Sequence, residues 1–137
     1  DVRMTSFMKE CERQGVACKV YSASEQMLWD MEYMPLINRI FMENPDMDGI
    51  FASSDIIAAQ CIQMAGTLGY RIPEDIKIVG YDDICLSRLL YPPLTTVHQD
   101  IKGLAKTAMD TVEELIEGKP VPESQVVSVS FIERKTT

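Results

Sequence analysis

The sequence predicts an α/β fold in which a parallel sheet is flanked by helices. Three observations carry this prediction. Short runs of β-forming residues alternate with longer runs whose apolar residues have helical spacing. The helix candidates follow capping residues and end at glycines. The strand candidates end in polar or turn residues. Strands that alternate with helices of ten or more residues are joined by right-handed crossovers, which produce a parallel sheet.

The composition is that of one globular domain with its own core. The 137 residues are 46% hydrophobic and 25% charged, and their net charge is −8. Apolar runs are too short for a membrane span, and we expect no secretion leader because no basic and then apolar run precedes Asp1. The acidic balance argues against binding of phosphate backbones by this segment. We therefore expect a soluble, cytoplasmic protein that makes no membrane contact.

The cysteines and the single His predict neither a disulfide framework nor a metal site. Cys11, Cys18, Cys61 and Cys85 form no C-x-x-C pair, and His98 is the only His. This is too few ligands at the wrong spacing for zinc. We expect four free thiols that fill the core of a protein in a reducing compartment, and we expect no cofactor.

The chain begins with a helix candidate and a strand candidate. Residues 3–14 carry apolar side chains at helical spacing, and Gly15 follows as a stop. Residues 16–21 are rich in β-formers and lead into the Ser-Ala-Ser sequence at 22–24. We expect an amphipathic helix followed by a strand.

The next part is predicted to be a loop, a helix and a strand. Pro35 lies within an apolar-periodic run, and proline is tolerated only in the first turn of a helix, so we expect a helix over 32–43. Residues 22–31, which include the only Trp, are then expected to form a loop. Residues 49–52 are expected to form a buried strand.

The middle of the chain is predicted to hold the most buried helix. Helix 55–68 has apolar residues nearly all round, which predicts burial on more than one side, against a sheet and against a partner chain. Strand 76–80 follows and ends in the acidic pair Asp82 and Asp83.

The last third is predicted to be a crossing, a helix and a strand. A proline pair breaks regular structure before the short extended segment 95–98. Helix 100–117 carries one apolar stripe, with Asp100 as its cap. Residues 125–132 are the last strand candidate.

Four stretches in this order make the chain recognisable. They are RMTSF at the start of the first helix, GIFASSDIIAAQ with IPEDIKIVGYDD, YPPLTTVHQD, and VSFIERKTT at the end. In combination the chain resembles the C-terminal half of the LacI/GalR family of bacterial transcription regulators over nearly its entire length. The resemblance implies a periplasmic binding protein-like core of two lobes that holds a small molecule between them.

The resemblance also implies a division of the chain. Residues 1–94 correspond to the C-terminal lobe, 95–128 to the hinge crossing and to elements of the N-terminal lobe, and 129–137 to a return tail. The family's helix-turn-helix head, most of its N-terminal lobe and the strand before the first helix lie outside the match. We therefore expect the 137 residues to be derived from a longer chain. We expect strand 125–132 to fill the place of the missing strand, or a neighbouring molecule to supply the missing cover by exchange.

A ligand site is predicted around Asp82 and Arg3. Asp82 ends a parallel strand, where open α/β sheets bind ligands, and its carboxylate can accept hydrogen bonds from vicinal hydroxyls. The alternative is a cap of the following turn, which is the role we expect for Asp83. By itself Arg3 indicates only a surface charge. The resemblance implies that its guanidinium lies in the cleft.

Three further residues have two interpretations. Ser54 stands where many sugar-responsive members of the family have Asn, a departure that weakens the expected polar contact with a sugar. Asp55 is retained, and we expect it to cap the helix that follows. Trp29 is expected either to stack on a ligand ring or to fill the core.

The resemblance implies an effector-binding and dimerisation module of a transcription regulator. Its expected partners are a small-molecule effector, such as a sugar or sugar derivative, a second copy through Ala59, Leu86, Leu89 and Leu90, and operator DNA only through the absent head. Effector binding would act by shifting populations rather than by chemistry.

Two alternatives belong to other classes. A periplasmic sugar-binding protein of a transport system shares the fold, but the PPLTTV and ERKTT sequences and the unpaired cysteines disfavour it. An enzyme that uses Cys85 with His98 is disfavoured because Cys85 has no nucleophile signature around it. We expect no catalytic residue and no metal.

Overall fold

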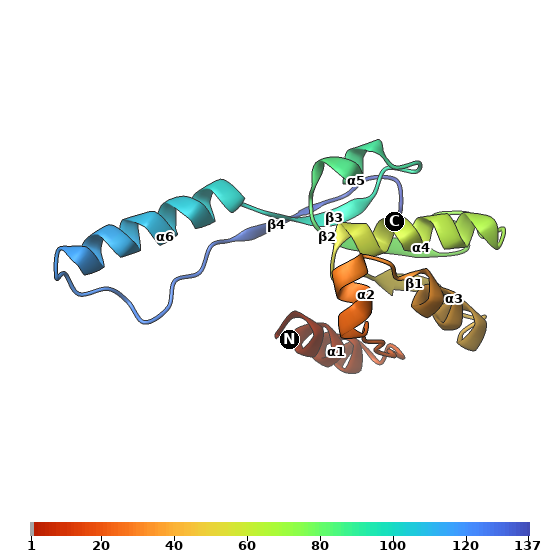
Figure 1. The fold of residues 1–137 in the computed structure, drawn as a ribbon. Helices are drawn as coiled ribbons and strands as arrows, with labels where there is room; N and C mark the ends of the chain where they lie inside the picture. The colour runs from red at the N-terminus through yellow and green to blue at the C-terminus, as the bar shows by residue number, and fades with distance from the viewer. Residues whose placement is uncertain (1) are drawn as a thin grey trace.

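Residues 2–137 are described by a computed structural model, in which an α/β body carries a long helical arm (Figure 1). The helices of the body are α1 (Val2–Gln14), α2 (Glu25–Asp30), α3 (Met34–Glu43), α4 (Asp55–Thr67) and α5 (Cys85–Leu89). Its strands are β1 (Gly49–Phe51), β2 (Lys77–Asp82) and β3 (Thr95–Gln99). The arm is formed by α6 (Ile101–Ile116), and the chain returns through β4 (Val129–Ile132).

The sheet has four strands in the order β1-β2-β3-β4. β1 pairs with β2 in parallel, and β2 pairs with β3 in parallel. β4 runs antiparallel to β3 because the chain leaves the body through β3 and comes back beside it. The predicted parallel sheet is therefore confirmed for its first three strands. Their carboxyl ends meet at one edge, which is where the candidate site lies.

The core lies between the sheet and helices α3 and α4. Its fully buried members come from α3 (Ile37), α4 (Ala58, Ala65) and the segments before and within the strands (Ile76, Ile78, Leu94). Cys61 also lies in this core, and burial raises the pKa of its thiol to about 12. The prediction of core cysteines holds for Cys61 alone, because Cys18 and Cys85 are exposed and Cys11 is only half-buried.

Gly80 allows α4 to lie directly on β2. A Cβ atom at this position would collide with an Asp55 carboxylate oxygen and would lie 2.8 Å from Leu94 Cδ2. Only a residue without a side chain leaves this space, so Gly80 places the first turn of α4 against the sheet. That turn carries Ser54 and Asp55 at the carboxyl edge.

The return tail is inserted between β2 and the start of β3. Thr136 is fully buried, and its hydroxyl donates to the Ile78 carbonyl (2.6 Å) and accepts from the Thr95 amide (2.8 Å). The Ile78 amide donates to the Thr136 carbonyl at 2.8 Å. The last residues of the chain thereby connect two strands of the sheet.

Two expectations for the N-terminal part are wrong. Residues 16–21 form no strand, and the free edge of β1 stays unpaired within 2–137. Local β-propensity alone does not provide the pairing of backbone groups that a strand requires. Residues 25–30 form helix α2 rather than a loop. The Ser24 hydroxyl accepts from the Met27 amide and so caps this six-residue helix.

The C-terminal part differs from expectation at one strand. Strand 125–132 is reduced to Val129–Ile132, and it pairs with β3 rather than filling the open edge beside β1. The expectation that this strand replaces the missing one is therefore wrong.

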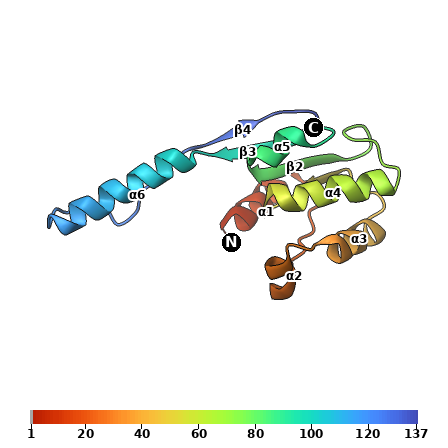
Figure 2. The same cartoon turned by 45° about the horizontal axis from the view of Figure 1, so that its top comes forward.

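Helix α6 leaves the body, as the second view shows clearly (Figure 2). None of its residues is buried, although it was predicted to carry an apolar stripe. Its exposed apolar side chains are Ile101, Leu104, Met109, Val112, Leu115 and Ile116. The expectation that this stripe lacks a cover agrees with the structure.

Candidate functional site

Asp82 lies at the carboxyl end of β2, where its carboxylate accepts a hydrogen bond from the Gln99 side-chain amide at 2.6 Å. The backbone φ is +115° at Asp82 and +54° at Asp83, a region that side chains rarely adopt. Such residues cost of the order of 1–3 kcal/mol each and persist only where the surrounding structure holds them. This turn is the most strained part of the sheet edge.

Arg3 lies at the same edge, although it belongs to α1. Its guanidinium carbon lies 4.7 Å from the centre of the Tyr81 ring, and Nη1 donates to the Ser53 carbonyl at 3.4 Å. The helix is held there by Phe7, whose ring stacks on Phe51 of β1 with centroids 4.8 Å apart. The structure thus brings Arg3 to the ends of β1 and β2, beside Asp82.

The charges around Asp82 oppose one another. Burial raises the pKa of its carboxyl, the Gln99 hydrogen bond lowers it, the charge of Asp55 raises it and the charge of Arg3 lowers it. The net effect is a raised pKa. A carboxylate that is partly desolvated beside a cation is well suited to bind a polar ligand, because a ligand's hydroxyl donors would replace lost water.

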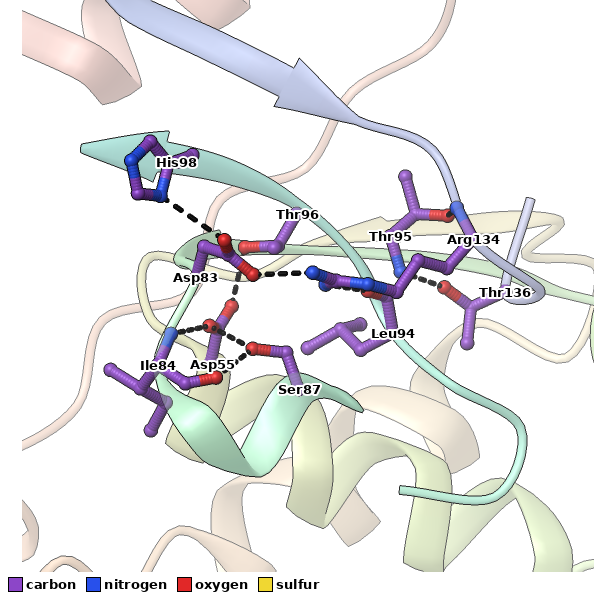
Figure 3. Close-up of polar contacts among 10 residues, drawn as sticks. All are labelled: Asp55, Asp83, Ile84, Ser87, Leu94, Thr95, Thr96, His98, Arg134 and Thr136. Carbon is purple, nitrogen blue, oxygen red and sulfur yellow. Dashed lines mark hydrogen bonds and ion pairs between the residues drawn. The ribbon is translucent and has the colours of Figure 1, made fainter. Parts of the chain in front are cut away.

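Asp83 forms an ion pair with Arg134 of the return tail and contacts His98 of β3 (Figure 3). Its Oδ1 accepts from Arg134 Nη2 at 2.6 Å, and its Oδ2 lies 3.1 Å from His98 Nδ1. Burial raises the pKa of Asp83, but the hydrogen bond and charge of Arg134, with the His98 contact, outweigh it, so the pKa is lowered. The expectation that Asp83 faces the turn or caps it is wrong, because both carboxylate oxygens contact side chains outside the turn.

Asp55 has a different role from the one we expected. It is the first residue of α4 rather than its cap, and it is fully buried. Its Oδ2 accepts from the Ile84 amide (2.9 Å) and the Ser87 hydroxyl (2.8 Å), and its Oδ1 accepts from the Thr96 hydroxyl (2.5 Å). Asp55 therefore holds the segment after Asp83 against the sheet (Figure 3).

Ser54 is the residue that caps α4. Its hydroxyl oxygen accepts from the Ile57 amide at 3.3 Å. An accepting hydroxyl still has its own proton to donate. Ser54 is half-buried beside Ser53, whose carbonyl contacts Arg3, so the structure places it next to the predicted ligand residues.

Trp29 lies on α2 and is 79% exposed. The interpretation that it fills the core is therefore wrong. Its contact with a ligand stays a prediction.

The predicted dimer face lies on α4 and α5, which contact each other. Leu89 is 75% exposed, whereas Ala59 and Leu86 are half-buried. Leu90 is also half-buried and packs against the core. Leu89 is thus the member of this set that is most available to a partner.

Gln99 was not among the predicted ligand residues, although it contacts Asp82. It ends β3 and donates to Asp82, so it belongs to the same edge. The rule that ligands bind beyond the carboxyl ends of parallel strands was applied to strand 76–80. Applied to the crossing segment as well, it would have found Gln99.

The described residues form neither a metal cluster nor a membrane span. Across 2–137, no three His, Cys, Asp or Glu side chains are placed to hold a metal ion. None of the helices described is long and apolar enough to cross a membrane.

The three parallel strands, the polar carboxyl edge and the strand pair that leads to and from α6 are the main features of this fold. The periplasmic binding protein-like domain family matches residues 1–137, and the chain belongs to this family. The predicted resemblance to LacI/GalR effector-binding domains is confirmed by the relatives found.

Repressors are among the relatives with curated names. The chain is 36% identical to the ribose operon repressor of Halalkalibacterium halodurans over 137 residues, which is 98% of this chain and 40% of that protein. It is 36% identical to the lactose operon repressor of Escherichia coli over 88 residues, which is 64% of this chain and 24% of that protein. The chain therefore spans well under half the length of these relatives.

Solved structures agree with the fold. A LacI family transcriptional regulator from Arthrobacter has a TM-score of 0.86 at 26% identity, over 99% of this chain and 51% of that one. The Lac repressor bound to ONPG has a TM-score of 0.85 at 28% identity, over 99% of this chain and 41% of that one.

Proposed function

We propose that this chain is the effector-binding and dimerisation part of a LacI-type transcription regulator in the bacterial cytoplasm. The observation that carries the proposal is the pairing of a partly desolvated Asp82 carboxylate with Gln99 and Arg3 at one edge of a parallel sheet. This edge offers acceptors and donors together, which is what a polyhydroxylated molecule requires. No chemistry on the ligand is involved.

The proposed effector is a sugar or sugar derivative. The same Arthrobacter regulator was solved in complex with lactose, at 26% identity to this chain. Another similar structure, from Alkaliphilus metalliredigens, holds D-xylulofuranose at 27% identity. Asp82, Arg3, Ser54 and Trp29 are the proposed ligand residues of this chain, and the geometry adds Gln99.

The proposed division of the chain follows the same reasoning. Residues 1–94 form one lobe, 95–128 cross toward a second lobe and contribute to it, and 129–137 return to the first. Operator DNA would be contacted only by a head domain outside these residues. The names of the relatives favour a regulator over a transport protein or an enzyme.

Calorimetric titration tests the site. D-ribose and lactose are titrated into the wild type, Asp82→Ala and Arg3→Ala, with Asp46→Ala and Arg13→Ala as exposed charge controls. Losing a hydrogen bond to a charged group costs about 1.5–3 kcal/mol, so we expect each site variant to bind at least ~10-fold more weakly. Weaker binding in the site variants, together with wild-type affinity in the two controls, would support the proposal. Unchanged affinity in both site variants would overturn it.

Trp29 provides an independent signal because it is the only Trp in the chain. Stacking on a sugar ring would bury an indole that is now 79% exposed and shift its emission to shorter wavelength. Emission that does not move at saturating sugar would remove Trp29 from the proposed site.

The proposed dimer face is tested separately by sedimentation. Leu89→Lys places a charge where a partner's apolar surface would lie, and Ala59→Lys does the same on α4. We expect both to shift the protein toward monomer at low micromolar concentration. Leu90→Lys is a poor probe, because Leu90 also packs on the core. A dimer unaffected by the first two changes would contradict the placement.

A further inference from the structure

The turn after β2 is held from outside by one side chain of the return tail. Asp82 and Asp83 both have positive φ, and neither is a glycine. A backbone of this kind persists only where its surroundings determine it. Arg134 supplies such a contact, since its Nη2 lies 2.6 Å from Asp83 Oδ1, with side chains only 15% and 9% exposed.

Arg134 is itself fixed at two further points. Its Nη1 donates to the Leu94 carbonyl at 2.7 Å, and its backbone amide donates to the Thr95 hydroxyl at 2.9 Å. The guanidinium is planar and rigid, so the positions of Leu94 and Asp83 are fixed relative to each other. Arg134 therefore connects the return tail, the start of β3 and the strained turn (Figure 3).

We propose that Arg134 is a positioning residue for the ligand site, because its contact with Asp83 fixes the turn that keeps the Asp82 carboxylate on Gln99. The proposal rests on the proposed function of Asp82 as a ligand residue. Arg134 itself acts through Asp83 and touches no ligand.

The geometry gives this contact a second consequence. Gln99 ends β3, and Arg134 follows β4, so both supports of the Asp82 turn come from the two strands that lead to and from α6. A shift of this strand pair relative to β2 would move Gln99 and Arg134 together. The orientation of Asp82 is therefore tied to the orientation of the crossing strands.

The test compares three variants in the intact chain. Arg134→Met removes the charge and the two N–H groups that donate to Asp83 and Leu94. Arg134→Lys keeps the charge without the planar guanidinium, and Asp83→Asn weakens the acceptor. Arg71→Met is the matched control, because Arg71 forms an exposed two-point contact with Asp75 elsewhere (2.8 and 2.5 Å).

The first measurement needs no ligand. The side-chain amide of Gln99 and the carboxyl carbon of Asp82 are observed by NMR, since their hydrogen bond reports the orientation of Asp82 directly. We expect both signals to move in Arg134→Met and Asp83→Asn, to be partly restored in Arg134→Lys, and to stay in place in Arg71→Met. A merely structural role would lower stability without moving these signals in the folded protein.

The second measurement is D-ribose affinity at a temperature where every variant is folded. We expect Arg134→Met to bind at least ~10-fold more weakly, with Arg134→Lys in between. If Asp82→Ala abolishes binding while Arg134→Met changes neither affinity nor the Gln99 signal, the positioning role is overturned and the proposed function stands. If Asp82→Ala has no effect on affinity, the proposed function fails, and the NMR signals alone decide the positioning role. Should Arg134→Met not fold, Arg134→Lys and Asp83→Asn decide it in the same way.

Discussion

The Asp55 carboxylate and the Thr96 hydroxyl form a 2.5 Å hydrogen bond that joins the first turn of α4 to β3, and both residues are fully buried (Figure 3). The same carboxylate accepts from the Ile84 amide and the Ser87 hydroxyl. One side chain thus connects a helix, the crossing strand and the segment that follows the ligand-site turn. The conformation of the carboxyl edge therefore depends on this buried carboxylate.

Replacing Asp55 should be among the most damaging changes in the body. In Asp55→Ala three donors lose their acceptor, and a buried donor without a partner costs about 1–3 kcal/mol. We expect unfolding free energy to fall by at least ~3 kcal/mol in urea denaturation. Exposed Asp46→Ala is the control and should stay within ~0.5 kcal/mol. A loss below ~1 kcal/mol in Asp55→Ala would contradict the network.

Gly80→Ala tests the close approach of α4 to β2. The added methyl would collide with the Asp55 carboxylate and with Leu94, so the helix or the carboxylate must move. Overpacking of this kind costs about 1–3 kcal/mol. Gly66→Ala is the matched control, because nothing lies within 4 Å of a Cβ there and alanine favours the helix. We expect Gly80→Ala to lower the unfolding midpoint and Gly66→Ala to raise it slightly.

The sequence predicts well what depends on local signals. Helices 3–14, 55–68 and 100–117 are found nearly as expected, because spacing, caps and glycine stops lie within each segment. The predicted strand at residues 16–21 is wrong for a non-local reason, since a strand needs a partner that no local pattern supplies. The predicted loop at residues 22–31 is wrong for a local reason, because the six residues of α2 are too few to show helical periodicity.

The site shows the same division. Asp82 is predictable from its place at the end of a strand. The contacts of Asp55 are not predictable in this way, because its partners lie 29 to 41 residues away in the sequence and no local spacing indicates them. Arg134 is further still from Asp83, at 51 residues. Contacts made by the return of the chain through β4 become visible only in the folded structure.

Asp82→Asn should stabilise the protein at neutral pH. Burial raises the pKa of Asp82 in the folded state, so the folded protein holds this proton more tightly than the unfolded chain. The contribution of the protonated Asp82 carboxyl to the free energy of unfolding is therefore lost as pH rises from the ordinary carboxyl range through the raised pKa. This contribution is absent at pH 7. Asn removes this effect and also tolerates positive φ. We expect a higher urea midpoint at pH 7, almost no gain at pH 3, and weaker sugar binding.

Asp83→Asn should change stability at pH 7 in the opposite direction from Asp82→Asn, so this neighbouring carboxyl is a matched control. Its pKa is lowered because Arg134 and His98 outweigh burial. A lowered pKa contributes stability above the ordinary carboxyl range that is lost as pH falls through the folded value. Asp83→Asn should therefore lower the urea midpoint at pH 7, and this effect should shrink as pH falls below the ordinary carboxyl range. Equal signs for the two variants would show that the charges around the turn are assigned wrongly.

The four cysteine thiols should differ in their reactivity toward a disulfide reagent. Burial raises the pKa of Cys61 to about 12, so almost no thiolate forms at pH 8, and the side chain is also covered. Cys85 is exposed at the start of α5. With a chromogenic disulfide reagent at pH 8, we expect Cys85 to react promptly and Cys61 to react only on unfolding. Mass spectrometry of the labelled peptides identifies them, and prompt labelling of Cys61 would contradict the core described above.

Among the described helices, α6 should be the one whose amide hydrogens are least protected from exchange with solvent, once differences in helix length are taken into account. It has 16 residues and none is buried, and a helix of this length without packing is marginal in water. The buried Ala58, Cys61 and Ala65 hold α4 to the sheet instead. We expect amides of α6 to exchange much faster than those of α4 at low protein concentration.

Leu115→Gln should change stability by less than ~0.5 kcal/mol, since this side chain is exposed, whereas Ile37→Ala should cost about 2–5 kcal/mol. If α6 were protected as strongly as α4, and Leu115→Gln destabilised the chain, its apolar stripe would be packed in solution, and rising protection with concentration would identify a second copy as the cover.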